Sequence, residues 1–201
     1  MDGCTSRVLN RVFWTVMALY IATATGCRWQ PVSKGNKAPQ GEAASGSGFL
    51  IRSAAFSDGQ TIPKEYTADG KNISPPVTWT DPPTGTKSFA IICEDPDAPG
   101  GTFTHWLIYN VPAELRSLEP GVPRDKKLTN GALQGKNDFG DIGYGGPDPP
   151  PGKPHRYIFR LYALDSVLDV QPEIERKDLL NAIQGHILAE AQLIGMYGRN
   201  K

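Results

Sequence analysis

Carboxylates and histidines grouped in two loops are the residues of this sequence that offer the clearest chemistry. Glu94, Asp95 and Asp97 lie within four positions and precede His105 in the stretch 94–106, EDPDAPGGTFTHW. His155 follows a second stretch rich in glycine and proline. Such side chains can act as acids and bases, ligate a metal, or surround an anion together with backbone N–H groups. Spacing alone favours a phosphate-like anion and a purely local structural role about equally.

Buried strands are expected to hold both loops in place. The apolar run 88–93 (SFAIIC) predicts a buried strand that ends at the acidic loop, and 106–111 (WLIYNV) predicts the next strand, with His105 at its head. The alternating run 157–163 (YIFRLYA) predicts a further strand, entered through His155. Prolines in both loops fix φ, so the loops should keep a defined shape. If these strands are neighbours, the two imidazoles reach one cavity.

Other chemistries receive less support from the sequence. No HxH, HExxH or CxxC pattern accompanies the histidines, so a metal site is disfavoured, and no GxSxG motif indicates a serine nucleophile. A hydrolase that uses an aspartate and a histidine as acid and base is the least favoured hypothesis. His186 is expected on a helix, four residues before Glu190, in a structural role. We therefore expect no enzymatic activity, no cofactor and no metal.

Composition limits the class of protein and its partners. The 201 residues carry 21 basic and 21 acidic side chains, so nucleic-acid binding has no electrostatic support. Glycine and proline are frequent, at 22 and 18 residues, which favours turns and strands over a helical bundle. Cys93 alone falls within the expected domain, so no internal disulfide is predicted, and a small buried side chain is the favoured interpretation.

The N-terminal segment has the features of an export signal. Residues 1–27 begin with a positive stretch, continue with the largely apolar run 12–24, and end in Ala-Thr-Gly before Cys27. This ending resembles the bacterial lipobox, which predicts lipidation of Cys27 and an exported, membrane-anchored protein of the cell envelope or periplasm. An ordinary secretory signal and an uncleaved anchor are the alternatives. Residues 28–48 predict a flexible tether, and 49–201 predict the folded domain.

One helix is predicted near the end of the chain, over residues 173–197. Apolar residues recur there at helical spacing, from Leu179 and Ile183 through Ile187 to Ala191. Asp178 lies early in this segment, as the helix dipole favours.

Long motifs in both loops resemble those of the phosphatidylethanolamine-binding protein family, in particular its bacterial Raf-kinase-inhibitor-like branch. The resemblance extends from about residue 49 to residue 197. The motifs, in chain order, are DGKNISPPVTW at 69–79, DPDAP at 95–99, His105-Trp106, GKNDFG at 135–140, GYGGPDPPPGKPHRY at 143–157 and GHILAEAQLIG at 185–195.

This resemblance implies a mainly β fold, with a large central antiparallel-rich sheet, a smaller flanking sheet and a C-terminal helix beside a pocket. In the family the pocket binds phosphate or the phosphoryl head of phosphatidylethanolamine. A carboxylate beside such an anion is acceptable if it is protonated or if it orients a cationic histidine. The residues at the matching positions are Asp95, Asp97, His105, Gly145, Pro150, His155 and Tyr157.

The expected function is therefore that of a binding module for a small anionic ligand, either phosphate or a phosphorylated or phospholipid head group, with an inhibitory or regulatory role left open. The alternative is a protein inhibitor of a secreted protease or other enzyme that uses the same loops. The resemblance does not indicate which protein target such an inhibitor would have. Many bacterial relatives carry a pair of cysteines that can form a disulfide bond. Ala68 and Asp148 occupy those positions here, so this disulfide bond is not expected.

Overall fold

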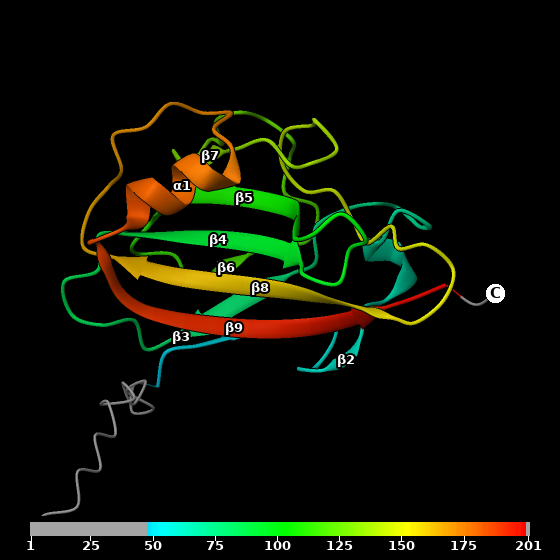
Figure 1. The fold of residues 1–201 in the computed structure, drawn as a ribbon. Coiled ribbons are helices and arrows are strands. Elements are labelled where there is room, and N and C mark those ends of the chain that lie inside the picture. Colours follow the sequence, from blue (N-terminus) through cyan, green and yellow to red (C-terminus); the bar gives the residue numbers. More distant parts are fainter. Residues whose placement is uncertain (1–47, 200–201) are drawn as a thin grey trace, which may run out of the picture. The chain divides into compact units, whose positions relative to one another are not determined.

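The computed structural model describes residues 48–199 (Figure 1). The predicted signal segment, Cys27 and the tether up to residue 47 lie outside this range. Within it, the structure has no helix of the length and hydropathy needed to cross a bilayer.

Two β-sheets and one α-helix make up the described domain, which confirms the mainly β fold. The large sheet has the strand order β2-β9-β8-β4-β5-β7, antiparallel except for the parallel pair β2 and β9. Its strands are β2 (Gln60–Thr61), β4 (Ser88–Asp95), β5 (Phe103–Pro112), β7 (Leu133–Gln134), β8 (His155–Leu164) and β9 (Ile187–Tyr197). The small antiparallel sheet has the order β1-β3-β6, made of β1 (Leu50–Arg52), β3 (Val77–Thr80) and β6 (Ser117–Leu118). A 3-10 turn, η1 (Lys64–Tyr66), and the helix α1 (Arg176–Ile183) complete the elements.

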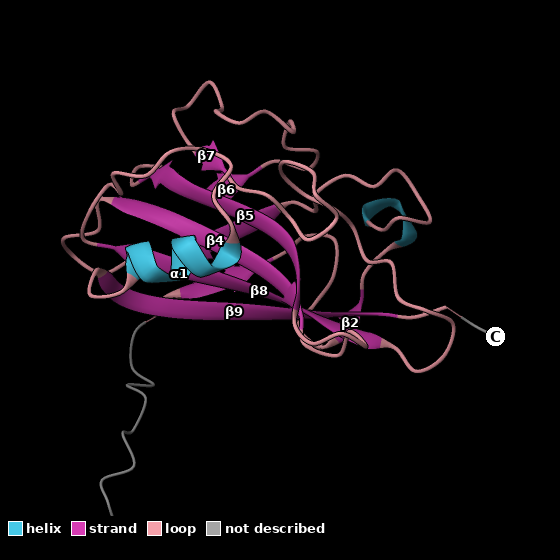
Figure 2. Ribbon diagram, turned by 45° about the horizontal axis from the view of Figure 1, so that its top comes forward, coloured by secondary structure: helices cyan, strands magenta, loops and turns pink. Residues whose placement is uncertain are grey.

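Strand β4 lies inside the large sheet, between β8 and β5, and both of its faces are covered. Phe89, Ile91 and Cys93 belong to the core that the large sheet shares with the small sheet. Ala90 and Ile92 face the opposite way and pack in a second core with residues of α1. Figure 2 shows α1 lying across one face of the large sheet. This double burial explains why the sequence of the strand is a continuous apolar run instead of an alternating one.

The predicted helix over 173–197 is wrong in its second half. The helix α1 stops at Ile183, and Gly185 follows with a left-handed φ of +85°, a backbone conformation that commonly ends helices. Residues 187–197 instead form β9, which pairs with β8 from Leu164↔Ile187 to His155↔Tyr197. The apolar residues of 187–197 fit a period of two as well as 3.6, and the ladder with β8 decides between them.

Candidate functional site

A small pocket lies at the end of the large sheet where β4 finishes and β8 begins. The loop that leaves β4 and the proline-rich loop that enters β8 lie at the same end of the sheet (Figure 1). Between them is a cavity of about 190 Å³, with Asp95, His105, His155 and Tyr157 as its central polar residues. The predicted convergence of the two histidines is therefore confirmed, and Pro150 also lines the cavity.

Asp95 and His155 form a hydrogen-bonded pair inside this pocket. Asp95 ends β4 and is 3% exposed. One carboxylate oxygen accepts the backbone N–H of Asp97 at 2.8 Å, and the other lies 2.7 Å from Nδ1 of His155. Because a carboxylate accepts a hydrogen, Nδ1 of His155 is the donor. Its Nε2, which has no hydrogen-bond partner among residues 48–199, is then the nitrogen left for a ligand.

A β-bulge directs His105 into the pocket. Cys93 of β4 pairs with Trp106, but Glu94 pairs with Thr104, so His105 is the extra residue of β5. A bulge bends the strand and re-aims a side chain. Without it, alternation would place His105 on the face of Leu107, which packs in the core on the α1 side.

Gly145 fixes the orientation and tautomer of His105. Nδ1 of His105 lies 2.7 Å from the carbonyl oxygen of Gly145, and the Gly145 N–H donates to the carbonyl oxygen of His105 at 2.8 Å. Since a carbonyl accepts only, Nδ1 carries the hydrogen, and Nε2 bears a lone pair when the ring is neutral. Burial lowers the pKa of His105 below its ordinary value of 6.5, although the Gly145 carbonyl and Asp95 act in the opposite direction. At neutral pH the ring therefore presents an acceptor.

Tyr157 supplies a buried hydroxyl that has no partner in the described structure. Its side chain is fully buried, packs edge-on against His105 with ring centroids 5.1 Å apart, and lines the cavity. The hydroxyl makes no hydrogen bond of good geometry among residues 48–199, although the Asp95 carboxylate lies near enough to interact with it. Burial and the nearby Asp95 charge raise the pKa of Tyr157, so the group remains protonated and can donate.

The rim of the pocket is largely apolar, and the sequence motifs do not predict it. Phe103 lies two residues before His105 on the same strand, and the two rings are 5.1 Å apart. Phe139, from the GKNDFG turn, packs edge-on against Phe103 at 4.7 Å and against His105 at 5.5 Å. The alternation of β5 gave a signal for Phe103, whereas nothing in the local sequence placed Phe139 here. Ala98, Pro99, Asp148 and Pro149 also line the cavity.

Two of the predicted site residues do not line the cavity. Gly145 contributes to the site by its hydrogen bonds with His105. Its Cα packs closely on the Phe139 ring, so an added Cβ would lie 2.6 Å from that ring. Asp97 points to Arg156, which donates to it from its backbone N at 3.0 Å, from Nε at 2.8 Å and from Nη2 at 2.7 Å. These bonds hold the pKa of Asp97 well below its usual range. Asp97 thus ties the loop to the start of β8.

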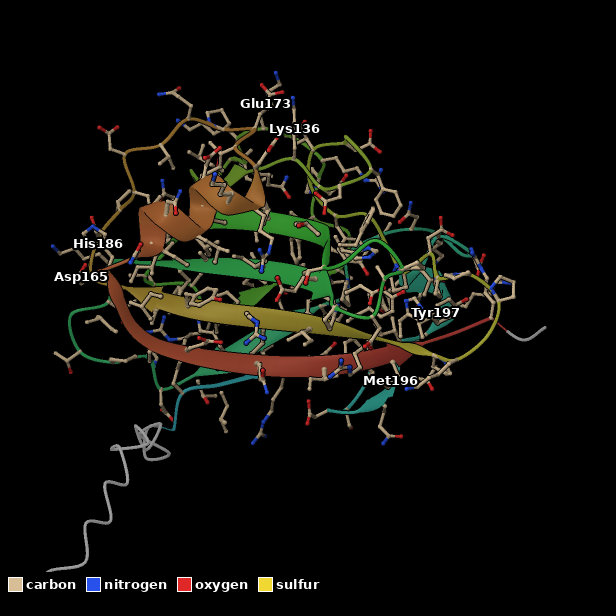
Figure 3. The ribbon with its side chains drawn as sticks, viewed as in Figure 1. Lys136, Asp165, Glu173, His186, Met196 and Tyr197 are labelled. Carbon is tan, nitrogen blue, oxygen red and sulfur yellow. The ribbon has the colours of Figure 1, made fainter. Side chains whose placement is uncertain are left out.

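The remaining candidate residues lie away from the pocket. His186 follows α1 instead of standing within the predicted helix, and its Nδ1 pairs with Asp165 at 2.8 Å. Figure 3 shows His186 and Asp165 at the opposite end of the large sheet from Tyr197. Cys93 is buried, as predicted. Residues 48–199 contain no group of three or more His, Cys, Asp or Glu side chains placed to hold a metal ion.

A mainly β domain with one small, aromatic-rimmed polar pocket is the class of protein that these observations define. The model of the phosphatidylethanolamine-binding protein family matches residues 52–198, and the chain belongs to this family.

Relatives and solved structures agree with this assignment. The chain is 52% identical over 149 residues to a UPF0098 protein of Methanothermobacter thermautotrophicus, covering 74% of this chain and 98% of the relative. It is 48% identical over 159 residues to a UPF0098 protein of Aquifex aeolicus, covering 78% and 92%. Among solved structures, a putative phosphatidylethanolamine-binding protein homologue from Chlamydia trachomatis matches with a TM-score of 0.70 and 39% identity, covering 77% of this chain and all of the other. YbcL of E. coli matches with a TM-score of 0.71 and 35% identity, covering 76% and 99%.

Proposed function

We propose that the pocket binds the phosphoryl group of a small anionic ligand, either phosphate itself or a phosphorylated or phospholipid head group, without transforming it. The observation that carries this proposal is a set of three polar atoms at one cavity that find no partner among residues 48–199: Nε2 of His105, Nε2 of His155 and the hydroxyl of Tyr157. Buried polar groups are normally hydrogen-bonded, so three free groups around one cavity favour a ligand that completes them.

The hydrogen-bonding capacities of these groups match most fully a phosphoryl group that carries one proton, such as inorganic phosphate or a phosphate monoester, whereas the phosphodiester of an intact phospholipid offers acceptors alone. The Tyr157 hydroxyl and a protonated His155 donate, whereas neutral His105 accepts through Nε2. Phosphate near neutral pH offers oxygen acceptors together with an O–H donor, and sulfate offers acceptors alone. The pocket should therefore prefer phosphate to sulfate, although the two ions have the same shape and similar size.

The buried carboxylate of Asp95 is compatible with an anion because of its pairing with His155. A protonated His155 and Asp95 at 2.7 Å form a pair with no net charge, and His155 directs its remaining N–H towards the ligand. Asp95 would then stabilise the imidazolium that the anion requires.

The test is a titration with inorganic phosphate, followed by calorimetry and by NMR of the histidine rings. His105→Ala and His155→Ala should each weaken phosphate binding by about tenfold or more, since hydrogen bonds to charged groups contribute about 1.5–3 kcal/mol. The chain has three histidines, and His186→Ala is the matched control, because His186 lies outside the pocket. Sulfate should bind more weakly than phosphate to the unaltered protein. Equal phosphate affinity in all three variants would refute the assigned pocket.

We further propose that the domain is held at a membrane of the cell envelope by a lipid on Cys27. The support comes from the sequence, where small residues precede Cys27 after an apolar run of signal-peptide length. A tethered domain would meet phospholipid head groups at a high effective concentration.

A further inference from the structure

The proline-rich wall of the pocket has few backbone donors of its own. Residues 147–151 read PDPPP, and proline has no backbone N–H. The loop therefore offers mainly carbonyl oxygens and the carboxylate of Asp148 to its surroundings. A segment of this kind is best held by a side chain with several donors, and arginine has five in a planar arrangement.

Arg199 occupies this position, close to the C-terminal end of the described chain. Its guanidinium donates from Nη1 to the Pro149 carbonyl at 2.9 Å and lies 2.6 Å from a carboxylate oxygen of Asp148 through Nη2. It also binds Asp69 in a bidentate manner, from Nε at 2.8 Å and from Nη2 at 2.5 Å. One side chain thus joins the wall of the pocket to the turn at Asp69. The Gly152 N–H donates in addition to the backbone carbonyl of Arg199 at 3.1 Å.

The other end of this connection is itself anchored to the core. Asp69 accepts a hydrogen bond from the hydroxyl of Tyr197 at 2.8 Å, and Tyr197 ends β9 beside His155 of β8. Figure 3 shows Tyr197 at the end of β9 that is remote from His186. Arg199 therefore fastens the loop to the sheet as well as to a turn.

The same guanidinium balances a charge that would oppose the proposed ligand. Asp148 and Pro149 both line the cavity, and the Asp148 side chain is 43% exposed. A free carboxylate at this rim would repel an anion entering the pocket. Pairing with Arg199 offsets part of this charge, because the guanidinium is shared between Asp148 and Asp69.

We propose that Arg199 is the positioning residue of the pocket: it holds the proline-rich wall in place and offsets part of the charge of Asp148 at the rim. The second half of this statement rests on the proposed binding of an anion. The first half concerns the unliganded protein and stands without it. Arg199 is not expected to contact the ligand.

The experiment compares Arg199→Gln, Arg199→Lys and the double variant Arg199→Gln/Asp148→Asn with the unaltered full chain. Lys126→Gln is the control, because it removes an equal charge from the Lys126–Glu173 pair, whose residues do not line the pocket. The first measurement is amide hydrogen exchange of Gly152 without ligand. The second is the dissociation constant for inorganic phosphate at low and at high salt.

Arg199→Gln should speed Gly152 exchange by about tenfold, because the loop loses its contacts with the guanidinium and opens more often. It should also weaken phosphate binding by about fivefold at low salt and by less at high salt, where the Asp148 charge is screened. Arg199→Lys keeps the charge but loses the planar guanidinium. Its Gly152 exchange rate and its phosphate affinity should therefore lie between those of Arg199→Gln and those of the unaltered protein. The double variant should regain most of the phosphate affinity while Gly152 still exchanges fast, a rescue that a merely structural role would not produce.

Unchanged exchange in Arg199→Gln would overturn the positioning role, whatever the ligand. Phosphate binding that is lost in Arg199→Gln and not regained on adding Asp148→Asn would overturn the proposed role of Arg199 in offsetting the charge of Asp148. If the unaltered protein does not bind phosphate at all, the proposed function fails, and the exchange measurement still decides whether Arg199 holds the wall.

Discussion

Replacing Tyr157 by phenylalanine should stabilise the protein and weaken its ligand binding. The Tyr157 hydroxyl is buried and has no hydrogen-bond partner among residues 48–199. A buried polar group without a partner costs about 1–3 kcal/mol, so its removal should raise the free energy of unfolding by about 1 kcal/mol, at the lower end of that range. For a chain of this size the melting temperature should then rise by about 2–4 °C.

Tyr144 provides the matched control for this substitution. It is also a buried tyrosine, but its hydroxyl donates to the carbonyl oxygen of Tyr66 at 2.8 Å. Tyr144→Phe removes this bond and leaves the carbonyl unpaired, so the free energy of unfolding should fall by about 1 kcal/mol and the melting temperature by about 2–4 °C. Both variants lose one oxygen atom from the interior, yet their effects on stability should have opposite signs.

The assay is thermal and urea unfolding of both variants without added anion, followed by titration with phosphate. Tyr157→Phe should weaken phosphate binding by about tenfold, whereas Tyr144→Phe should leave the affinity unchanged. If Tyr157→Phe destabilises the protein as much as Tyr144→Phe does, the hydroxyl has a partner in the unliganded protein, and the reasoning from an unpaired group is refuted.

Three further predictions concern the pocket and the anchor. Burial lowers the pKa of His105, so below pH 6.5 the unfolded chain binds more protons than the folded chain does. The free energy of unfolding should therefore decrease as the pH falls below that value. His105→Gln should flatten this pH dependence, as measured by urea unfolding. Gly145→Ala should weaken phosphate binding, because the new Cβ would lie 2.6 Å from the Phe139 ring, whereas Gly100→Ala, whose Cβ meets nothing within 4 Å, should bind phosphate normally in the same titration. Mass spectrometry of the mature chain should find a diacylglyceryl group on an N-terminal Cys27, and an unmodified chain that begins elsewhere would contradict the anchor.

The apolar runs of the sequence predicted the strands that carry the site. The run at 88–93 is continuous because two cores enclose β4, and the alternation at 157–163 belongs to β8. The spacing of apolar residues in 187–197 predicts a helix because local spacing does not report the partner strand. The exposed residues Ile187 and Leu188 would have been core positions of that helix, and the ladder with β8 leaves them 43% and 41% exposed.

The site was predictable in its polar centre and less so in its supports. The motifs placed Asp95, His105 and His155 correctly around one cavity. The motifs did not show that Asp97 lies outside the cavity. Its three hydrogen bonds from Arg156 depend on how the loop turns over the start of β8. Phe139 was missed because it reaches the pocket from a turn more than 30 residues away from His105, and only tertiary packing brings the two rings together.

The bulge at His105 is the feature of the site that the sequence pattern specifies least. Side chains alternate strictly along a regular strand, so one additional residue reverses the face of all that follow. Trp106 and Ile108 lie in the core between the sheets, and an unbroken alternation from them would send His105 to the side of α1. His105 is itself the extra residue, because Cys93 pairs with Trp106 and Glu94 pairs with Thr104. The bulge therefore turns the His105 ring to the face of Tyr157 and Asp95. The convergence of the two histidines therefore depends on a single-residue irregularity in β5 that no hydrophobic pattern specifies.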